Sequence, residues 1–140
     1  MNSIRVVLDT NVVISAYLND AGFERYVLDL VLAGKLELVV SKEILEEYEA
    51  VLCRPKFGFS RKMVARSLRM LRSKARIVRP RKKLSAARDP DDKSFLECAH
   101  VARAHFLVTG NSRHFPKAWR QTLVLNAREL VEWIAPDLRR

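Results

Sequence analysis

The stretch Ile4-Arg5-Val6-Val7-Leu8-Asp9-Thr10-Asn11 decides how the chain folds, because its apolar run ends abruptly on a carboxylate. Apolar runs of this kind are typical of a strand buried on both faces of a parallel sheet, where a charge fits only at the strand's end. In open α/β sheets, ligand and catalytic sites lie beyond the carboxyl ends of the strands. Asp9 is therefore a candidate site residue. In the alternative interpretation, Asp9 or Thr10 simply caps the helix that follows.

The rest of the chain alternates between short apolar runs and helical patterns. Strands are predicted at residues 36–40, 75–78, 105–109 and 122–125. Helices are predicted at residues 12–18, 23–33, 42–53, 90–103 and 127–134, with Pro136 stopping the last one. This alternation predicts an α/β fold with a parallel sheet covered by helices. A length of 140 residues and a hydrophobic content of 49% predict one domain spanning residues 1–140.

The composition predicts a polyanionic partner and a reducing compartment. The formal net charge is +10, which favours nucleic acid or an acidic protein as the partner. Cys53 and Cys98 lie in helical patterns without metal-binding spacing, so we expect buried free thiols. No leader pattern occurs, and no run approaches the roughly 18 apolar residues of a membrane span. We expect a cytoplasmic protein that does not bind a membrane.

The positive charge is concentrated in residues 50–88, which contain 14 of the 26 Lys and Arg residues and no Asp or Glu. Apolar residues between 63 and 71 recur at helical spacing, so this part is predicted to form an amphipathic helix with a cationic exterior. Arg81, Lys82 and Lys83 follow Pro80 in a predicted exposed loop. Such a charge run is often only a solvated face. In a chain of this net charge it favours contacts to phosphates or to an acidic partner.

Other polar positions occur where a site next to Asp9 would need them. Asp92 lies in the first turn of a helix opened by Pro90, and it projects along the same side as the apolar residues of that helix. Asn111 ends a strand in a way that resembles the end of the first strand. In the helix at 42–53, Glu47 and Glu49 both border the buried stripe, and the helical pattern leaves the choice between them open.

A cluster of carboxylates is costly unless a cation neutralises it, because like charges raise each other's pKa. Oxygen ligands suit Mg²⁺ or Mn²⁺, and such ions support hydrolysis of phosphodiesters by water. Other catalytic sets are not readable: no Cys–His pair or zinc spacing occurs, and only four glycines are present, with no phosphate-binding loop.

Four motifs in order across the chain resemble the PIN domain. They are Val7-Leu8-Asp9-Thr10-Asn11-Val12, the Glu47 helix, Asp89-Pro90-Asp91-Asp92-Lys93-Ser94-Phe95-Leu96-Glu97-Cys98-Ala99 and Leu107-Val108-Thr109-Gly110-Asn111-Ser112-Arg113-His114-Phe115. In particular they resemble the VapC-like toxins of toxin–antitoxin systems. The resemblance implies a three-layer α/β/α sandwich with a central parallel sheet, frequent dimerisation and metal-dependent cleavage of RNA.

Carried over by position, the resemblance implies that Asp9, Glu47 and Asp92 hold the metal, and it selects Glu47 over Glu49. Asn111 would complete the catalytic and metal site. Thr10, Asn11 and Thr109 would support these groups. Arg113 and His114 are candidate RNA contacts or ordinary turn residues, and Arg81, Lys82 and Lys83 are further candidate RNA contacts.

One position departs from the family pattern, in which Thr-Gly-Asp is common at the fourth strand. Here the last residue is Asn111, whose amide oxygen can bind a metal but brings no charge, so a second metal should bind more weakly. We expect a Mg²⁺- or Mn²⁺-dependent endoribonuclease, the toxin of a type II toxin–antitoxin pair, with RNA, an antitoxin and a second copy as partners. The alternative is a weakly active or inactive PIN-like module that binds RNA or protein.

Overall fold

The computed structural model describes residues 3–80, 90–111 and 115–138, with only the backbone described at 90–92 and 136–138. Its strands are β1 (Arg5–Leu8), β2 (Glu37–Val40), β3 (Ala75–Ile77), β4 (Phe106–Val108), β5 (Ala118–Trp119) and β6 (Thr122–Leu125). Its helices are α1 (Thr10–Leu18), α2 (Phe23–Leu32), α3 (Lys42–Leu52), the short 3₁₀ helix η1 (Pro55–Phe57), α4 (Arg61–Lys74), α5 (Pro90–Ala102) and α6 (Ala127–Leu138).

The described strands form one six-stranded sheet in the order β3-β2-β1-β4-β6-β5. Every neighbouring pair is parallel except β5 with β6, which is antiparallel. This confirms the predicted central parallel sheet and adds an edge strand, β5, that the sequence did not predict. A strand of two residues has too short an alternation to be read from a sequence.

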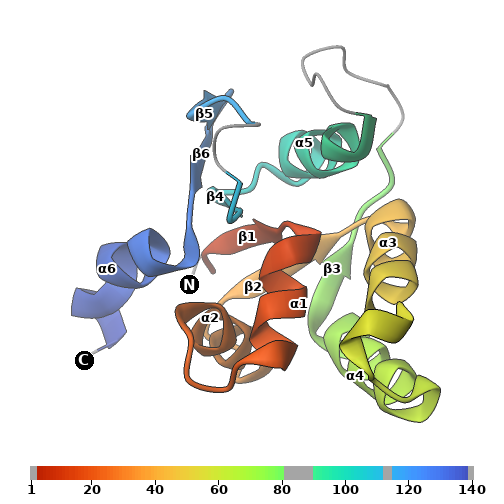
Figure 1. The fold of residues 1–140 in the computed structure, drawn as a ribbon. Coiled ribbons are helices and arrows are strands. Elements are labelled where there is room, and N and C mark those ends of the chain that lie inside the picture. The colour runs from red at the N-terminus through yellow and green to blue at the C-terminus, as the bar shows by residue number, and fades with distance from the viewer. Residues whose placement is uncertain (1–2, 81–89, 112–114, 139–140) are drawn as a thin grey trace.

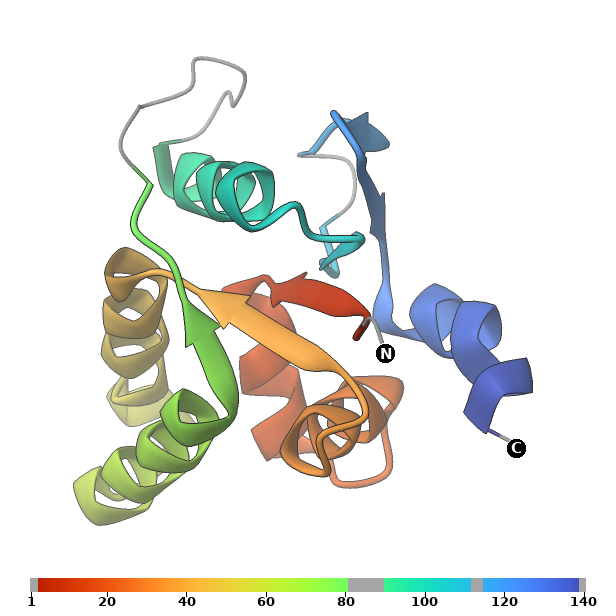
Figure 2. The same cartoon turned by 180° about the vertical axis from the view of Figure 1, so that it is seen from behind.

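Helices cover the sheet on both faces (Figures 1 and 2). α5 packs on β1, β2 and β4 from one side, while α1 lies on the opposite side in contact with α2 and α3. α6 extends this second layer through α2, and α4 continues it at the β3 edge. The three-layer α/β/α arrangement expected from the sequence is confirmed.

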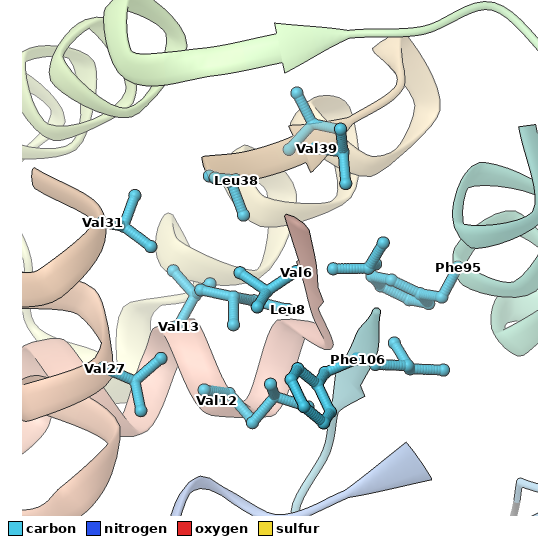
Figure 3. Packing of buried hydrophobic residues seen from close by; sticks show 14 of the residues in the cluster. Val6, Leu8, Val12, Val13, Val27, Val31, Leu38, Val39, Phe95 and Phe106 are labelled. Atoms are coloured by element: carbon cyan, nitrogen blue, oxygen red, sulfur yellow. The ribbon is translucent and has the colours of Figure 1, made fainter. Parts of the chain in front are cut away.

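The apolar runs of the central strands form the middle of the core (Figure 3). Val6, Val7 and Leu8 are fully buried, as are Leu38 and Val39 of the neighbouring strand. Apolar side chains from the helices on either side pack against them, Val13 of α1 and Phe95 of α5 among them. Burial on both faces explains why β1 reads as a continuous apolar run rather than an alternating one.

Local capping fixes where several helices begin. The hydroxyl of Ser41 accepts a hydrogen bond from the N–H of Ile44 at 3.3 Å, as predicted for the start of α3. At the start of α6, the N–H of Glu129 donates to Asn126 Oδ1 at 2.8 Å, and Glu129 Oε1 accepts from the N–H of Asn126 at 3.0 Å. This reciprocal pair is a capping box, which starts α6 directly after the end of β6.

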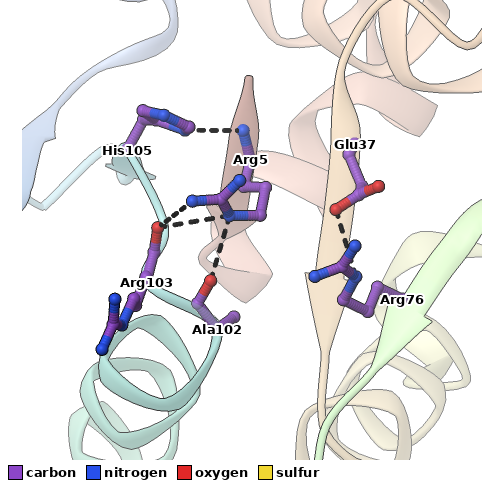
Figure 4. Close-up of polar contacts among 6 residues, drawn as sticks. All are labelled: Arg5, Glu37, Arg76, Ala102, Arg103 and His105. Carbon is purple, nitrogen blue, oxygen red and sulfur yellow. Dashed lines mark hydrogen bonds and ion pairs between the residues drawn. The ribbon is translucent and has the colours of Figure 1, made fainter. Parts of the chain in front are cut away.

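Polar contacts also join the strands at their amino ends (Figure 4). The N–H of Arg5 donates to His105 Nδ1 at 2.9 Å, and the Arg5 guanidinium donates to the carbonyls of Ala102 and Arg103. Burial, and then the charge of Arg5, lower the pKa of His105. An ion pair of 3.3 Å between Arg76 and Glu37 joins β3 to β2. These contacts lie at the edge opposite to Asp9.

Two expectations from the sequence were wrong. α6 does not stop before Pro136 but runs to Leu138. Pro136 has no N–H to donate, so the last turn of α6 contains one hydrogen bond fewer. Cys53 is exposed rather than buried, because it follows the last residue of α3. Cys98 is buried as predicted, and no disulfide joins the two thiols. Within the described residues, no helix is long and apolar enough to cross a membrane.

Candidate metal centre at the ends of β1 and β4

The candidate site lies where the order of the strands reverses. From β1 the chain proceeds to β2 on one side, whereas β4 and β6 continue the sheet on the other. Open α/β sheets bind ligands at such a switch point, outside the carboxyl ends of the two strands. Leu8 pairs with Val108 at these ends, and the N–H of Asp9 donates to the Val108 carbonyl at 2.9 Å. The residues just after β1 and β4 are therefore neighbours.

The carboxylate of Asp9 is held by bonds from both strand ends. Its Oδ1 accepts from the N–H of Thr10 at 2.8 Å, and its Oδ2 accepts from the hydroxyl of Thr109 at 2.7 Å. Asp9 is 8% exposed and Thr109 is 0% exposed. Asp9 is also the N-cap residue of α1. Asp9 therefore caps α1 and remains a candidate site residue, two roles that the sequence presented as alternatives. Thr10 is the first residue of the helix.

Thr10 connects Asp9 to α3. Its hydroxyl donates to Glu47 Oε2, while its backbone N–H is bonded to Asp9. Glu47 is half-buried, whereas Glu49 is exposed and lines a separate hollow with Lys42 and other residues. The structure therefore brings Glu47, and not Glu49, next to the Asp9 carboxylate. Thr10 thus contacts two acids, Asp9 through its backbone N–H and Glu47 through its hydroxyl.

Tyr48 is a supporting residue that was not among the site residues predicted from the sequence. Its hydroxyl donates to the Leu8 carbonyl at 2.5 Å, at the last residue of β1. Burial raises the pKa of Tyr48 well above its ordinary value, with nearby Cys98, Asp9 and Glu47 as lesser causes. The phenol is thus held as a neutral donor that fixes α3 to the strand end. A tyrosine directly after the helix acid was the available signal.

The amides following the two strands also meet. Asn11 Oδ1 accepts from the N–H of Gly110 at 3.2 Å, and the N–H of Asn111 donates to the Thr109 hydroxyl at 3.0 Å. Asn111 is exposed. Asn11, Gly110 and Asn111 line one side of a hollow of about 530 Å³, whose other side is formed by the starts of α2 and α6. The predicted supporting residues Thr10, Asn11 and Thr109 are all at the site.

The remaining predicted residues lie wholly or partly outside the described atoms. The backbone of Asp92 lies in the first turn of α5, and its side chain lies outside the described atoms. Arg81, Lys82, Lys83, Arg113 and His114 lie outside the described residues. Among the side chains that are described, no group of at least three His, Cys, Asp or Glu residues is placed to hold a metal ion. The described part of the candidate site therefore consists of two acids and their supporting hydroxyls and amides.

The donor chemistry of these groups fits a hard divalent cation. Asp9, Glu47, Thr10 and Thr109 offer only oxygen atoms, which suit Mg²⁺ and Mn²⁺. A carboxylate oxygen has more than one acceptor direction, so a carboxylate that accepts hydrogen bonds can also bind a cation. Cysteine chemistry is disfavoured nearby, because burial raises the pKa of the Cys98 thiol to about 12.

The described basic residues of α4 lie elsewhere. Arg69 and Arg72 line the hollow of about 820 Å³ that also contains Glu46 and Glu49 of α3 and the end of β3. None of the residues that contact Asp9 is part of its lining. The amphipathic, cationic helix predicted for this window is confirmed, with Val64 and Leu71 buried and the basic side chains of α4 exposed.

Comparisons with known proteins identify the fold and the family. The solved VapBC2 structure from Rickettsia felis, bound to a DNA fragment from their promoter, has a TM-score of 0.59 and 17% identity, covering 87% of this chain and 98% of that one. This likeness shows a shared fold. The uncharacterized protein MJ1680 of Methanocaldococcus jannaschii is 33% identical over 114 residues, which are 77% of this chain and 71% of that protein. The family model of the PIN domain matches residues 5–113, and the chain belongs to this family.

Proposed function

We propose that the protein is a Mg²⁺- or Mn²⁺-dependent endoribonuclease that acts as the toxin of a type II toxin–antitoxin pair. The observation that carries the proposal is the series of hydrogen bonds that joins Glu47, Thr10, Asp9 and Thr109 at the switch point of the sheet, with Thr10 bonded to Asp9 through its backbone N–H. PIN domains are generally nucleases, which supports the reaction class. The net charge of +10 supports RNA as the substrate.

Asp9 and Glu47 would hold the metal, with Asp92 as the third acid and Asn111 as an added oxygen ligand. A bound metal of this kind supplies a water activated for attack and neutralises the negative charge of the phosphodiester. The chain's own groups do the positioning. Thr109 and the N–H of Thr10 hold the Asp9 carboxylate, and the Thr10 hydroxyl holds Glu47. Groups fixed in this way lose little entropy when the reaction begins.

The test is cleavage of a mixed-sequence RNA with Mn²⁺, with Mg²⁺ and with EDTA, comparing the wild type with Asp9→Asn. Because an asparagine still offers an oxygen to the Thr10 N–H, the variant should fold while losing the negative charge. Cleavage should fall by at least about a hundredfold, in line with removal of a metal ligand. Asp20→Asn makes the same chemical change on an exposed turn residue and should leave the rate unchanged. Cleavage that survives both EDTA and Asp9→Asn would refute the metal mechanism.

Asn111 favours a second candidate, a PIN-like module that binds RNA or protein without cutting it. An amide in place of an acid weakens the charge of the site. The same titration separates the two functions. A binding module would hold RNA equally well with EDTA and with Mn²⁺, and would release it intact under every condition.

The partners are part of the proposal. A toxin of this class requires an antitoxin, and the solved structure that shares this fold is a VapBC2 assembly from Rickettsia felis. We propose an antitoxin whose acidic side chains contact the exposed arginines of α4, and we propose a homodimer as the active form. Purification with a co-expressed neighbouring small acidic protein, followed by measurement of mass in solution, tests both.

A further inference from the structure

We propose that the hollow of about 530 Å³ beside the acids binds one nucleobase of the RNA next to the bond that is cut. The proposal rests on the ribonuclease function above. Asn11 of α1 and Asn111 after β4 line one wall, and Phe23 of α2, Asn126 and Arg128 at the start of α6 line the other. The volume lies within the range of roughly 300–1,000 Å³ that small-molecule sites occupy.

The hollow lies next to the candidate metal centre along the chain, because its lining residues Asn11 and Gly110 closely follow Asp9 and Thr109. Asn11 follows Asp9 by two residues, and its Oδ1 accepts from the N–H of Gly110, which follows Thr109. Asn111 is part of both the lining and the strand end that bonds to Asp9 through Thr109. A nucleotide whose phosphate lies at Asp9 would thus have this hollow within reach of its base.

The lining has the chemistry of a base-binding site. Amide side chains carry both donors and acceptors and can match the edge of a base, and an exposed aromatic ring offers a surface for stacking. Phe23 is 46% exposed and lines the hollow. The amides are also held in place, because Asn11 is bonded to Gly110 and Asn126 is bonded to Glu129. Lining groups that are already fixed lose little entropy when a ligand binds.

The charge of the hollow argues for a base rather than a phosphate. Among its described lining residues, the charged ones are one acid, Glu24, and one base, Arg128. Arg128 is further paired with Glu132, with 3.0 Å between Nε and Oε1. The larger hollow between α3 and α4 differs, because it contains several arginines and no aromatic side chain among its described lining residues. A hollow whose described charges balance, with an aromatic ring in its lining, suits the uncharged part of a nucleotide.

The test measures binding without cleavage. An Asp9→Asn protein in EDTA is titrated with short RNAs that carry 2-aminopurine at one position each, and the fluorescence reports stacking. At one position the fluorescence should be quenched on binding. Phe23→Leu should weaken affinity by roughly fivefold or more and abolish the quenching, because stacking on an aromatic ring is lost. Phe23→Tyr, which keeps a ring, should retain both.

Tyr26→Leu is the matched control. Tyr26 is an aromatic residue of the same helix with 45% exposure, and it does not line the hollow. It should leave affinity and quenching unchanged. An RNA with an abasic nucleotide at the responsive position should bind equally to the Asp9→Asn protein and to its Phe23→Leu variant. Such an RNA lacks the base that would stack on the Phe23 ring.

Three results would overturn the proposal: no quenching at any position, equal effects of Phe23→Leu and Tyr26→Leu, or a Phe23→Leu effect that persists on abasic RNA. Failure here is distinct from failure of the ribonuclease function. If the wild type cuts RNA but Phe23→Leu binds normally, the subsite is wrong and the function stands. If quenching depends on Phe23 but the wild type cuts nothing, the subsite stands and the ribonuclease is wrong.

Discussion

The ends of β1 and β4 lie side by side and have similar sequences, yet they differ in the burial of their polar residues and in the element that follows. Each apolar strand is followed by three residues that end in an asparagine, Asp9-Thr10-Asn11 in one case and Thr109-Gly110-Asn111 in the other. After β1 the chain enters α1 at once, and Asp9 is buried as its cap. After β4 the next described element is β5, and Asn111 is exposed.

This difference divides the candidate site into a fixed half at the end of β1 and an adjustable half at the end of β4. A cap residue is held by the helix it begins, so the position of the Asp9 carboxylate follows from the fold. Among the described contacts, Asn111 is held through its backbone N–H, which donates to the Thr109 hydroxyl. Its side chain is exposed, so it can be substituted without disturbing the core. We infer that the β1 end sets the chemistry and that the β4 end tunes the strength of metal binding.

The largest expected effect comes from removing the second charge of the fixed half. Glu47→Gln keeps an oxygen that can accept from the Thr10 hydroxyl, so the fold should be retained while the charge is lost. Cleavage should fall by about a hundredfold, which is typical for loss of a group that orients or activates water. The measurement is the initial rate of RNA cleavage at saturating Mn²⁺.

Glu49→Gln is the matched control for this change. Glu49 lies on the same helix but lines the hollow between α3 and α4. Its variant should cut RNA at the rate of the wild type. Equal losses in the two variants would mean that the series from Asp9 to Glu47 does not define the site.

A smaller effect is expected from the bond that joins the two strand ends. Thr109→Val keeps the shape of the side chain but removes the hydroxyl that donates to Asp9 and accepts from Asn111. Because Thr109 is fully buried, the free energy of unfolding should fall by about 1–3 kcal/mol. Cleavage should fall roughly tenfold as Asp9 loses one of its positioning bonds.

Thr122→Val separates stability from function. Thr122 is also fully buried, and its hydroxyl donates to the Ala104 carbonyl at 2.7 Å, at the opposite ends of the strands. Urea unfolding should show a comparable loss, with cleavage unchanged below the transition. If Thr122→Val slows cleavage as much as Thr109→Val, the bond to Asp9 has no special role.

Much of this arrangement was predictable because the signals are local. The apolar run before Asp9 identified a strand with both faces buried, and Ser41 identified the start of α3. The sequence also placed Asp9, Thr109 and Asn111 at strand ends, and parallel strands necessarily bring such ends to one edge of the sheet.

The remainder depends on long-range packing. The bond from Tyr48 to the Leu8 carbonyl and the hollow lined by Phe23 join segments far apart in the chain, which no periodicity reveals. The choice between Glu47 and Glu49 also depends on how α3 packs against a distant part of the chain. On a helical pattern both border the buried stripe. The family resemblance favoured Glu47, and the position of α3 against Thr10 shows that Glu47 is the one bonded there.

The smallest expected effect tests the adjustable half directly. Asn111→Asp adds a charge at an exposed position beside the acids, so the Mn²⁺ concentration for half-maximal cleavage should fall about threefold to tenfold with little change in stability. Gln121→Glu adds the same charge on an exposed turn at the amino end of β6, and it should leave the Mn²⁺ dependence unchanged. Equal shifts in the two variants would assign the effect to net charge. A shift confined to Asn111→Asp, with stability and maximal rate unchanged from the wild type, would show that the residue at the end of β4 sets the affinity for the metal.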